Sequence, residues 1–129
     1  MAVGVSTGEP RPELETRTVE KPWGHELIWA LTDRYCGKIL FVRGGESLSL
    51  QYHRERDESW YVIEGRAMLE FGSVDGPRET VEIGPGDAFR FVPQTVHRVS
   101  AIADTRIFEV STPELDDLVR LEDRYGRAE

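Results

Sequence analysis

Residues 44–65, GGESLSLQYHRERDESWYVIEG, contain the alternation and the turn that decide the fold. Side chains two residues apart on a strand point to the same face, so Gln51 and His53 are predicted to share one face of a strand. A charged turn follows, and an aromatic and β-branched run then ends at Gly65. Glu58 opens that run, and an antiparallel hairpin would return its carboxylate to the side of Gln51 and His53.

The rest of the chain reads as further short strands separated by Gly, Pro and Asp turns. The runs are 25–31, 36–42, 47–53, 59–65, 66–72, 79–84, 88–92, 97–102 and 105–111. So many short strands, with no long amphipathic helix among them, predict an all-β sandwich or barrel. No repeat with a period of 20 to 50 residues is visible, which excludes a solenoid.

The two ends of the chain differ from this pattern. Residues 1–17 are rich in Gly, Pro, Ser, Thr and Glu without periodicity, and we expect a disordered tail there, followed by a single domain at 18–129. Thr112 is a plausible N-cap with Pro113 at the first helical position, and Gly126 is a plausible terminator. One short C-terminal helix is therefore expected between them.

Composition narrows the class of partner. The 129 residues include 24 Asp and Glu against 16 Lys and Arg, for a net charge of −8. This charge would repel a phosphate backbone, so we expect no nucleic-acid partner, although a pocket with one or two cations still suits a small anion. A single cysteine, Cys36, excludes an intrachain disulfide, and we see neither a signal peptide nor an apolar run near the ~20 residues that a membrane-spanning helix needs. We expect a cytoplasmic protein with no membrane partner.

A fourth polar residue joins the group far along the chain, where VPQTVH (92–97) places His97 after a turn at Pro93. Two imidazoles and oxygen donors are ligands that suit Zn²⁺, or another first-row divalent ion such as Mn, Co, Ni or Fe. Each residue alone has a simpler explanation, because a strand histidine is usually hydrogen-bonded structure and an acid in RERDES is usually solvated. The joint spacing of Gln51, His53, Glu58 and His97 is what predicts a metal site.

This spacing, G-x5-Q-x-H-x4-E-x6-G followed by P-x3-H, resembles the two motifs of the cupin superfamily, a small jelly-roll β-barrel with a metal inside. Gln51 stands where most cupins have histidine, and GESLSLQYH is similar to the C-terminal isomerase domain of the type II (bifunctional) phosphomannose isomerases, which are fused to GDP-mannose pyrophosphorylase. KPWG (21–24) and DDLVRLEDRYGR (116–127) match the same domain. Gln94 departs from the glycine usual there. We expect a freestanding isomerase domain without pyrophosphorylase activity.

The resemblance implies interconversion of mannose 6-phosphate and fructose 6-phosphate through a cis-enediol. This reaction needs a cation that stabilises charge on the sugar oxygens, a base for a carbon-bound proton, and donors for the phosphate. Arg56 aligns with an arginine of the family and is a candidate for contact with the enediolate or the phosphate, and Glu109 is the candidate base if it faces inward. The candidate phosphate-binding residues are Lys21, Arg120 and Arg124.

Two other classes of protein fit the same residues. One is another cupin enzyme, a dioxygenase or an epimerase. Cupin dioxygenases tend to use three or more histidines, so the position of His25 tests this class. The other is a non-catalytic metal-binding or sugar-binding cupin. Kinship of fold and the apolar runs ELIWAL (26–31) and ILFV (39–42) also predict a homodimer.

Overall fold

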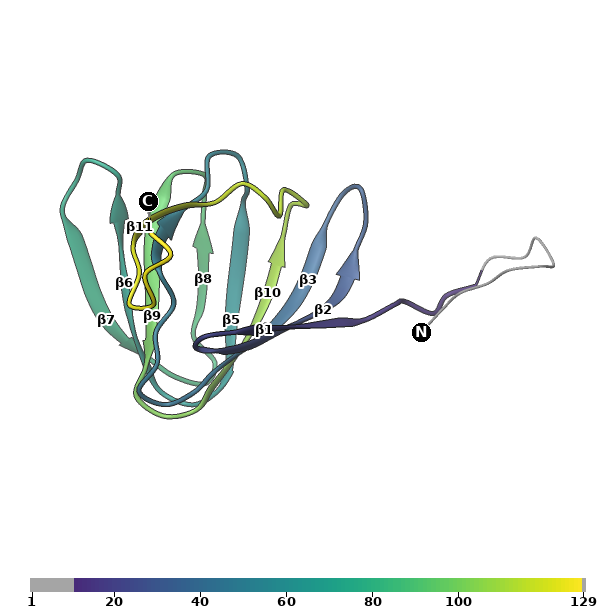
Figure 1. Ribbon diagram of the computed structural model, residues 1–129, viewed down its shortest axis with the longest axis horizontal. Coiled ribbons are helices and arrows are strands. Elements are labelled where there is room, and N and C mark those ends of the chain that lie inside the picture. Colours follow the sequence, from purple (N-terminus) through teal and green to yellow (C-terminus); the bar gives the residue numbers. More distant parts are fainter. Residues whose placement is uncertain (1–10, 129) are drawn as a thin grey trace.

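The computed structural model describes residues 11–128 as two antiparallel sheets that face one another (Figure 1). One sheet has the strand order β1-β2-β3-β10-β5-β8 and the other β11-β4-β9-β6-β7. The strands are β1 (Arg17–Lys21), β2 (Gly24–Leu31), β3 (Cys36–Val42), β4 (Leu50–Tyr52), β5 (Glu58–Glu64), β6 (Ala67–Ser73), β7 (Arg78–Ile83), β8 (Ala88–Phe91), β9 (Thr95–Ala101), β10 (Thr105–Ser111) and β11 (Val119–Glu122). The predicted all-β jelly roll is confirmed.

Strand alternation places the core between the sheets. Along β10, buried and exposed residues alternate strictly, so that Ile107 and Glu109 point inward while Phe108 and Val110 point outward. The inward residues of the other strands join Ile107 in one cluster around Trp60, Val62 and Leu69. Trp23, Leu40 and Leu48 of this cluster also line a cavity whose other residues are mostly polar or charged.

Turn chemistry fixes where the strands end. Gly65, between β5 and β6, has φ = 102°, and a Cβ atom there would lie 2.4 Å from the carbonyl oxygen of Asp104. Only glycine fits this crossing. Gln94, between β8 and β9, has φ = 69° and is the only non-glycine residue with positive φ in the described range. The backbone N–H of Gln94 donates a 2.7 Å hydrogen bond to the backbone carbonyl oxygen of His53. This bond links two segments that carry predicted metal ligands.

The prediction of a short C-terminal helix is wrong. Residues 113–118 form tight turns, in which Leu115 N–H bonds to the Pro113 carbonyl and Leu118 N–H to the Asp116 carbonyl. The chain then enters β11, which pairs with β4. A helix was favoured by local signals at Thr112 and Pro113, but pairing with the edge of β4 satisfies the backbone of β11 instead. The segment lies across the barrel rather than beside it (Figure 1).

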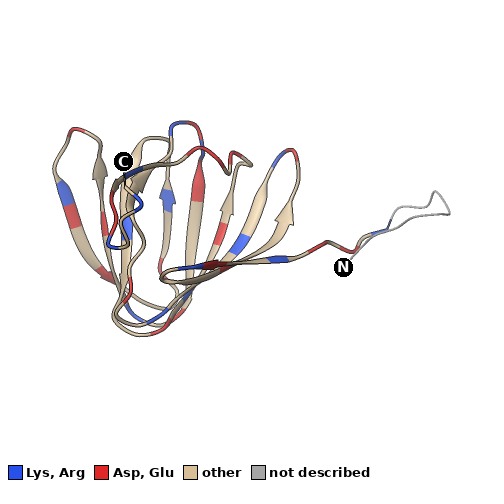
Figure 2. Cartoon of the chain, in the orientation of Figure 1, with Lys and Arg blue, Asp and Glu red and all other residues tan. Residues whose placement is uncertain are grey.

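The first strand, β1, begins at Arg17, and the division into a tail at 1–17 and a domain at 18–129 stays a prediction. Residues 1–10 of the tail expected at 1–17 lie outside the described residues, and residues 11–16 form no helix or strand. No helix in residues 11–128 has the length and hydrophobicity of a membrane span. Basic and acidic residues are interspersed along the strands and loops rather than gathered on one segment (Figure 2).

Candidate metal centre and cavity

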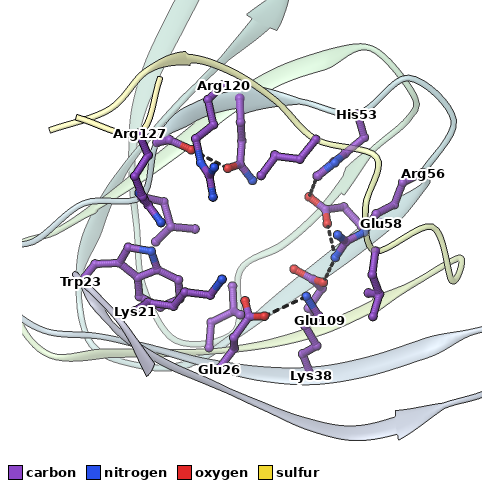
Figure 3. Close-up of a pocket in the computed structure, with 16 residues that line it drawn as sticks. Lys21, Trp23, Glu26, Lys38, His53, Arg56, Glu58, Glu109, Arg120 and Arg127 are labelled. Carbon is purple, nitrogen blue, oxygen red and sulfur yellow. Dashed lines mark hydrogen bonds and ion pairs between the residues drawn. The ribbon is translucent and has the colours of Figure 1, made fainter. Parts of the chain in front are cut away.

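A cavity lined mostly by polar and charged side chains lies between the two sheets (Figure 3). His53 and Glu58 lie at one side of it, and Lys21, Trp23 and Arg120 lie at the other. Glu26, Lys38, Arg56, Glu109, Leu115, Leu118 and Arg127 complete most of the wall. The C-terminal segment that was expected to be helical thus supplies part of the cavity.

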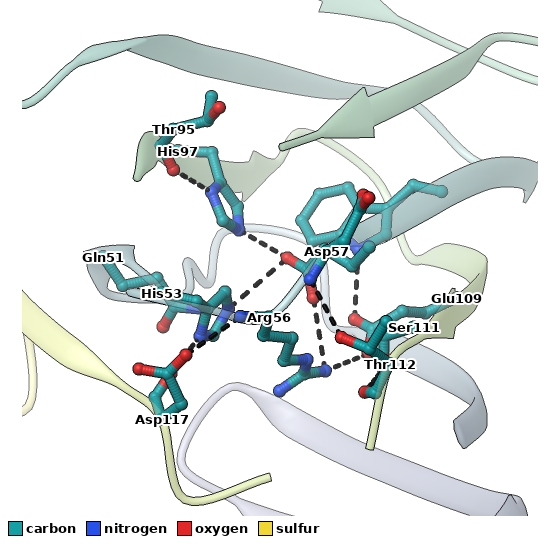
Figure 4. A network of polar contacts seen from close by, with 12 residues as sticks. Gln51, His53, Arg56, Asp57, Thr95, His97, Glu109, Ser111, Thr112 and Asp117 are labelled. Atoms are coloured by element: carbon teal, nitrogen blue, oxygen red, sulfur yellow. Dashed lines mark hydrogen bonds and ion pairs between the residues drawn. The ribbon is translucent and has the colours of Figure 1, made fainter. Parts of the chain in front are cut away.

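Three buried residues bring possible metal ligands together (Figure 4). His53 follows β4, Glu58 begins β5 and His97 lies in β9. One ligand atom from each lies within 4.8 Å of the others. Glu58 Oε1 is 2.7 Å from His97 Nε2 and 3.5 Å from His53 Nε2. Residues separated by 44 positions in the sequence therefore meet at one point, as the motif spacing predicted.

The far side of each imidazole ring is held by a backbone carbonyl. His53 Nδ1–H donates to Asp117 O at 2.5 Å, and His97 Nδ1–H donates to Thr95 O at 2.9 Å. Since a carbonyl oxygen only accepts, each Nδ1 carries a proton, and the Nε2 of each ring is the nitrogen that faces Glu58. Contacts of this kind orient metal-binding histidines.

The three converging atoms fit a cation. His53 Nε2, His97 Nε2 and Glu58 Oε1 are buried, and none of them has a hydrogen-bond partner. Unpartnered buried polar atoms are costly, and a divalent ion among them would remove that cost. Burial opposes the charge of Glu58, but the adjacent His53 and His97 rings and the Arg56 guanidinium outweigh it and hold its pKa well below the ordinary range. A carboxylate that stays ionised is what a metal ligand requires.

Gln51, the fourth predicted ligand, pairs in register with His97 across β4 and β9 and also lines the cavity. Its amide oxygen accepts a hydrogen bond from Ser49 Oγ at 2.6 Å. A carbonyl oxygen has a second lone pair, so this bond does not exclude a metal. Ligation by Gln51 stays a prediction.

Arg56 is buried beside the metal centre. Its Nη2 lies 3.2 Å from Glu58 Oε2 and also donates to Glu109 Oε2. The other oxygen of Glu109 accepts a 3.0 Å hydrogen bond from the indole of Trp60. Burial, together with the negative charge of Glu58, raises the pKa of Glu109, although Arg56 acts in the opposite direction. The pKa values of these two neighbouring carboxyl groups are thus shifted in opposite directions. The lowered pKa of Glu58 suits a metal ligand, and the raised pKa of Glu109 suits a group that carries a proton.

Of the three cationic residues predicted to bind a phosphate, two line the cavity and one lies outside it. Lys21 and Arg120 line the cavity, and the buried Nε of Arg120 has no hydrogen-bond partner. Arg124 does not line it, because its guanidinium donates to the Gly45 carbonyl at 2.5 Å outside the cavity. Arg127, which was not singled out in the sequence, is in the cavity wall and pairs with Asp123. The assignment of Arg124 to a binding role is therefore not supported by its position.

Four further residues of the site were missed. Glu26 and Lys38 are charged residues at inward positions of strands that are otherwise apolar inside, a signal that the sequence did contain. Trp60 belongs to the core cluster, and its indole also donates a hydrogen bond to Glu109. Asp117 gave no signal, because its role depends on a contact 64 residues away in sequence.

His25 lies outside the cavity, with its ring stacked on Phe41 at a centroid distance of 5.2 Å. The metal centre in the described residues therefore has two histidines. This arrangement does not favour a dioxygenase that uses three or more histidines.

Comparison with known proteins agrees with this architecture. The chain is 34% identical over 116 residues to the mannose-1-phosphate guanylyltransferase ManC of Salmonella typhimurium, an alignment that covers 86% of this chain and 23% of ManC. The chain thus spans about a quarter of the length of such relatives. Among solved structures, KdgF from Halomonas sp. has a TM-score of 0.65 at 25% identity, covering 80% of this chain and 91% of KdgF.

Oxalate decarboxylase from Bacillus subtilis superposes with a TM-score of 0.70 at 16% identity, over 83% of this chain and 30% of the decarboxylase, which shows a shared fold. The family model described as "Mannose-6-phosphate isomerase C-terminal" matches residues 10–123. The two facing sheets and the His53–Glu58–His97 cluster agree with this match. The chain therefore belongs to the mannose-6-phosphate isomerase C-terminal family of cupin-like domains.

Proposed function

We propose that the protein is a metal-dependent sugar-phosphate isomerase that interconverts mannose 6-phosphate and fructose 6-phosphate. The observation that carries this proposal is the layout of one cavity. The unpartnered ligand atoms of His53 and Glu58 lie at one side, with that of His97 within 4.8 Å of both, and the cations Lys21 and Arg120 lie at the other (Figure 3). The two ends of a hexose 6-phosphate match the two sides of this cavity, because the reacting carbons lie at one end and the phosphate lies at the other.

His53, Glu58 and His97 would hold the ion, with the amide oxygen of Gln51 as a further donor. Imidazole and carboxylate donors favour Zn²⁺, and Mn, Co, Ni and Fe accept the same set. When bound, the ion supplies positive charge that stabilises an enediolate.

Glu109 is the proposed proton carrier. It accepts the C2 proton of the aldose, which leaves a cis-enediolate with its charge on O1. A proton then moves from O2 to O1, and Glu109 returns its own proton to C1, which gives the ketose. Arg56 contacts both Glu109 and Glu58 and keeps their charges balanced before and after each transfer. Trp60 fixes the carboxyl plane of Glu109 by its indole hydrogen bond.

The phosphate is proposed to bind at the opposite side of the cavity. Arg120 offers an Nε–H that is buried without a partner, and such a donor gains a charge-assisted bond from a phosphate oxygen. Lys21 and Arg127 lie at the same side (Figure 3). Arg127 is already paired with Asp123, so Arg120 and Lys21 are the principal candidates.

The experiment is a reaction in D₂O followed by NMR. Metal-loaded protein is mixed with mannose 6-phosphate, and the C2 proton and the signals of fructose 6-phosphate are recorded. We expect ketose formation that stops with a chelator, returns with Zn²⁺ and is absent from His53→Ala. Metal-loaded wild-type protein that forms no ketose would contradict the proposal.

A second candidate is a cupin that binds a metal and a sugar without turnover. It is favoured by one observation, which is that both oxygens of Glu109 are already engaged, by Trp60 and by Arg56. In the same experiment this candidate predicts a rise in Tm on addition of mannose 6-phosphate without ketose formation. A cytoplasmic location also stays a prediction, in keeping with an intracellular sugar phosphate as substrate.

A further inference from the structure

Glu26 and Lys38 form a second ion pair in the cavity, apart from the metal centre. Lys38 Nζ lies 3.2 Å from Glu26 Oε1, and only 8% and 14% of the respective side chains are exposed. Both residues line the cavity, one from β2 and one from β3. Lys38 and Lys21 are the only lysines of the chain, and both lie in this cavity.

Burial of this pair is costly, so its presence calls for a reason. Taking two charges out of water costs several kcal/mol per ion, and apolar residues of similar size are often at least as stable. The inward neighbours of Lys38 on β3 are Cys36 and Leu40, both buried. An apolar residue at position 38 would therefore continue the core.

The position of the pair indicates which part of a sugar it would meet. Glu26 and Lys38 lie along one wall, between Lys21 and Glu109 (Figure 3). Lys38 is also the register partner of Glu109 across β3 and β10. A hexose 6-phosphate that spans the cavity from Lys21 to the metal centre would place its ring oxygen and O1 next to this wall.

We propose that Glu26 and Lys38 open the sugar ring before isomerisation. Glu26 accepts the proton of the O1 hydroxyl as the C1=O1 bond forms. The C1–O5 bond breaks, its electron pair stays on O5, and Lys38 donates a proton to O5. The proton then passes from Glu26 to Lys38 across their contact, and both groups return to their starting states. This step rests on the proposed function for its substrate, a hexose 6-phosphate.

Ring opening is measured separately from isomerisation with 2-deoxyglucose 6-phosphate. This sugar lacks O2, so it cannot form an enediol, but its α and β anomers interconvert by ring opening. Saturation transfer between the two C1 protons in the NMR spectrum gives the exchange rate. We expect metal-loaded wild-type protein to accelerate the exchange above the buffer rate. Glu26→Gln and Lys38→Met should each lose at least about tenfold of that acceleration, in line with the usual share of acid–base catalysis.

Lys38→Arg distinguishes this role from a structural ion pair. Arginine keeps the charge beside Glu26, but its guanidinium does not release a proton near neutral pH. Glu82→Gln is the matched control, because Glu82 forms an exposed ion pair with Arg66 on the other sheet. We expect Lys38→Arg to lose the acceleration and Glu82→Gln to keep it.

Two results would overturn the assignment: no acceleration by the wild type, or a Lys38→Arg rate equal to that of the wild type. Neither result depends on ketose formation. A protein that isomerises without accelerating anomer exchange refutes only the ring-opening pair. A protein that accelerates exchange without isomerising refutes only the isomerase.

Discussion

His53 Nδ1–H donates a hydrogen bond to the backbone carbonyl of Asp117, a residue 64 positions further along the chain. The side chain of Asp117 reinforces this contact, since its carboxylate accepts the backbone N–H groups of Arg54, Glu55 and Arg56 at 2.9, 2.6 and 2.9 Å. One aspartate thus fixes the loop after His53 and the orientation of its ring. The cavity wall and the metal centre are joined through this residue.

Asp117→Ala should weaken metal binding although Asp117 is not a ligand. Loss of the carboxylate removes the acceptor of three backbone N–H groups, two exposed and one partly buried, and lets the carbonyl move away from His53. Outer-shell changes of this kind typically cost about 10–100-fold in metal affinity. Competition titration with Zn²⁺ measures the effect, with Asp116→Ala as the neighbouring control. Equal affinities for Asp117→Ala and the wild type would show that the loop is held by other contacts.

Glu109→Gln should abolish ketose formation while leaving metal binding intact. The amide has the same shape and keeps an acceptor for Trp60, but it cannot take a carbon-bound proton. Loss of a general base typically lowers the rate by about 10²–10⁴-fold. Rate and bound metal are measured on the same sample. A variant that keeps the wild-type rate would remove Glu109 from the mechanism.

The stability of Glu109→Gln should also depend on pH. Burial raises the pKa of Glu109, so the folded protein binds its proton more tightly than the unfolded chain does. Wild-type stability from this group is then present at low pH and is lost as pH rises through the window between the unfolded and the folded pKa. The stability of the variant relative to the wild type should therefore be greater at pH 7 than at pH 4, as measured by urea unfolding. The opposite trend would mean that Arg56 outweighs burial.

Gln94→Gly should stabilise the protein. Gln94 has φ = 69°, a region that is unfavourable by about 1–2 kcal/mol for a residue with a side chain. Glycine removes this cost but gains freedom in the unfolded chain, so a net gain of about 0.5–1 kcal/mol is expected. Val92→Gly, in the same turn with ordinary negative φ, should destabilise. Thermal unfolding of both variants checks the signs, and a lower Tm for Gln94→Gly would indicate that the glutamine side chain has a stabilising contact.

The homodimer predicted from sequence has a candidate surface on the outer face of the six-stranded sheet. Strand register places Ile39, Phe108 and Tyr61 in one row, and Phe108, Val110 and Tyr61 are exposed. A contiguous apolar sheet face is typical of an interface between copies. Light scattering after gel filtration should give a dimer for the wild type and a monomer for Phe108→Lys. Val81→Lys, on an exposed residue of the other sheet, is the control. A monomeric wild type would refute the dimer.

Much of the metal centre could be predicted from sequence because it depends on local geometry. Period-2 alternation puts Gln51 and His53 on one face, and the hairpin length brings Glu58 back beside them. His97 joined the predicted group only through the spacing of the two motifs, since nothing local links position 97 to position 53. Glu109 was ambiguous in sequence, and only the pairing of β10 between β3 and β5 settles that it points inward.

The errors arise where tertiary contacts override local signals. The capping pattern at Thr112 and Pro113 favoured a helix, but Leu115 and Leu118 face the cavity and β11 pairs with β4. The same change of conformation turns Arg120 toward the cavity and Arg124 away from it. The inward position of a charged residue such as Lys38 could be predicted from strand alternation. A charged residue at such a position indicates a polar site inside the barrel.

The account depends most directly on the three converging atoms of His53, Glu58 and His97. Calorimetric titration of metal-free protein with Zn²⁺ tests it. We predict one tightly bound ion per chain for the wild type and for His25→Ala, whose histidine lies outside the cavity, and loss of that binding in folded His53→Ala and His97→Ala. Binding that survives both of these substitutions, or no binding by the wild type, would contradict the metal centre and with it the proposed isomerase.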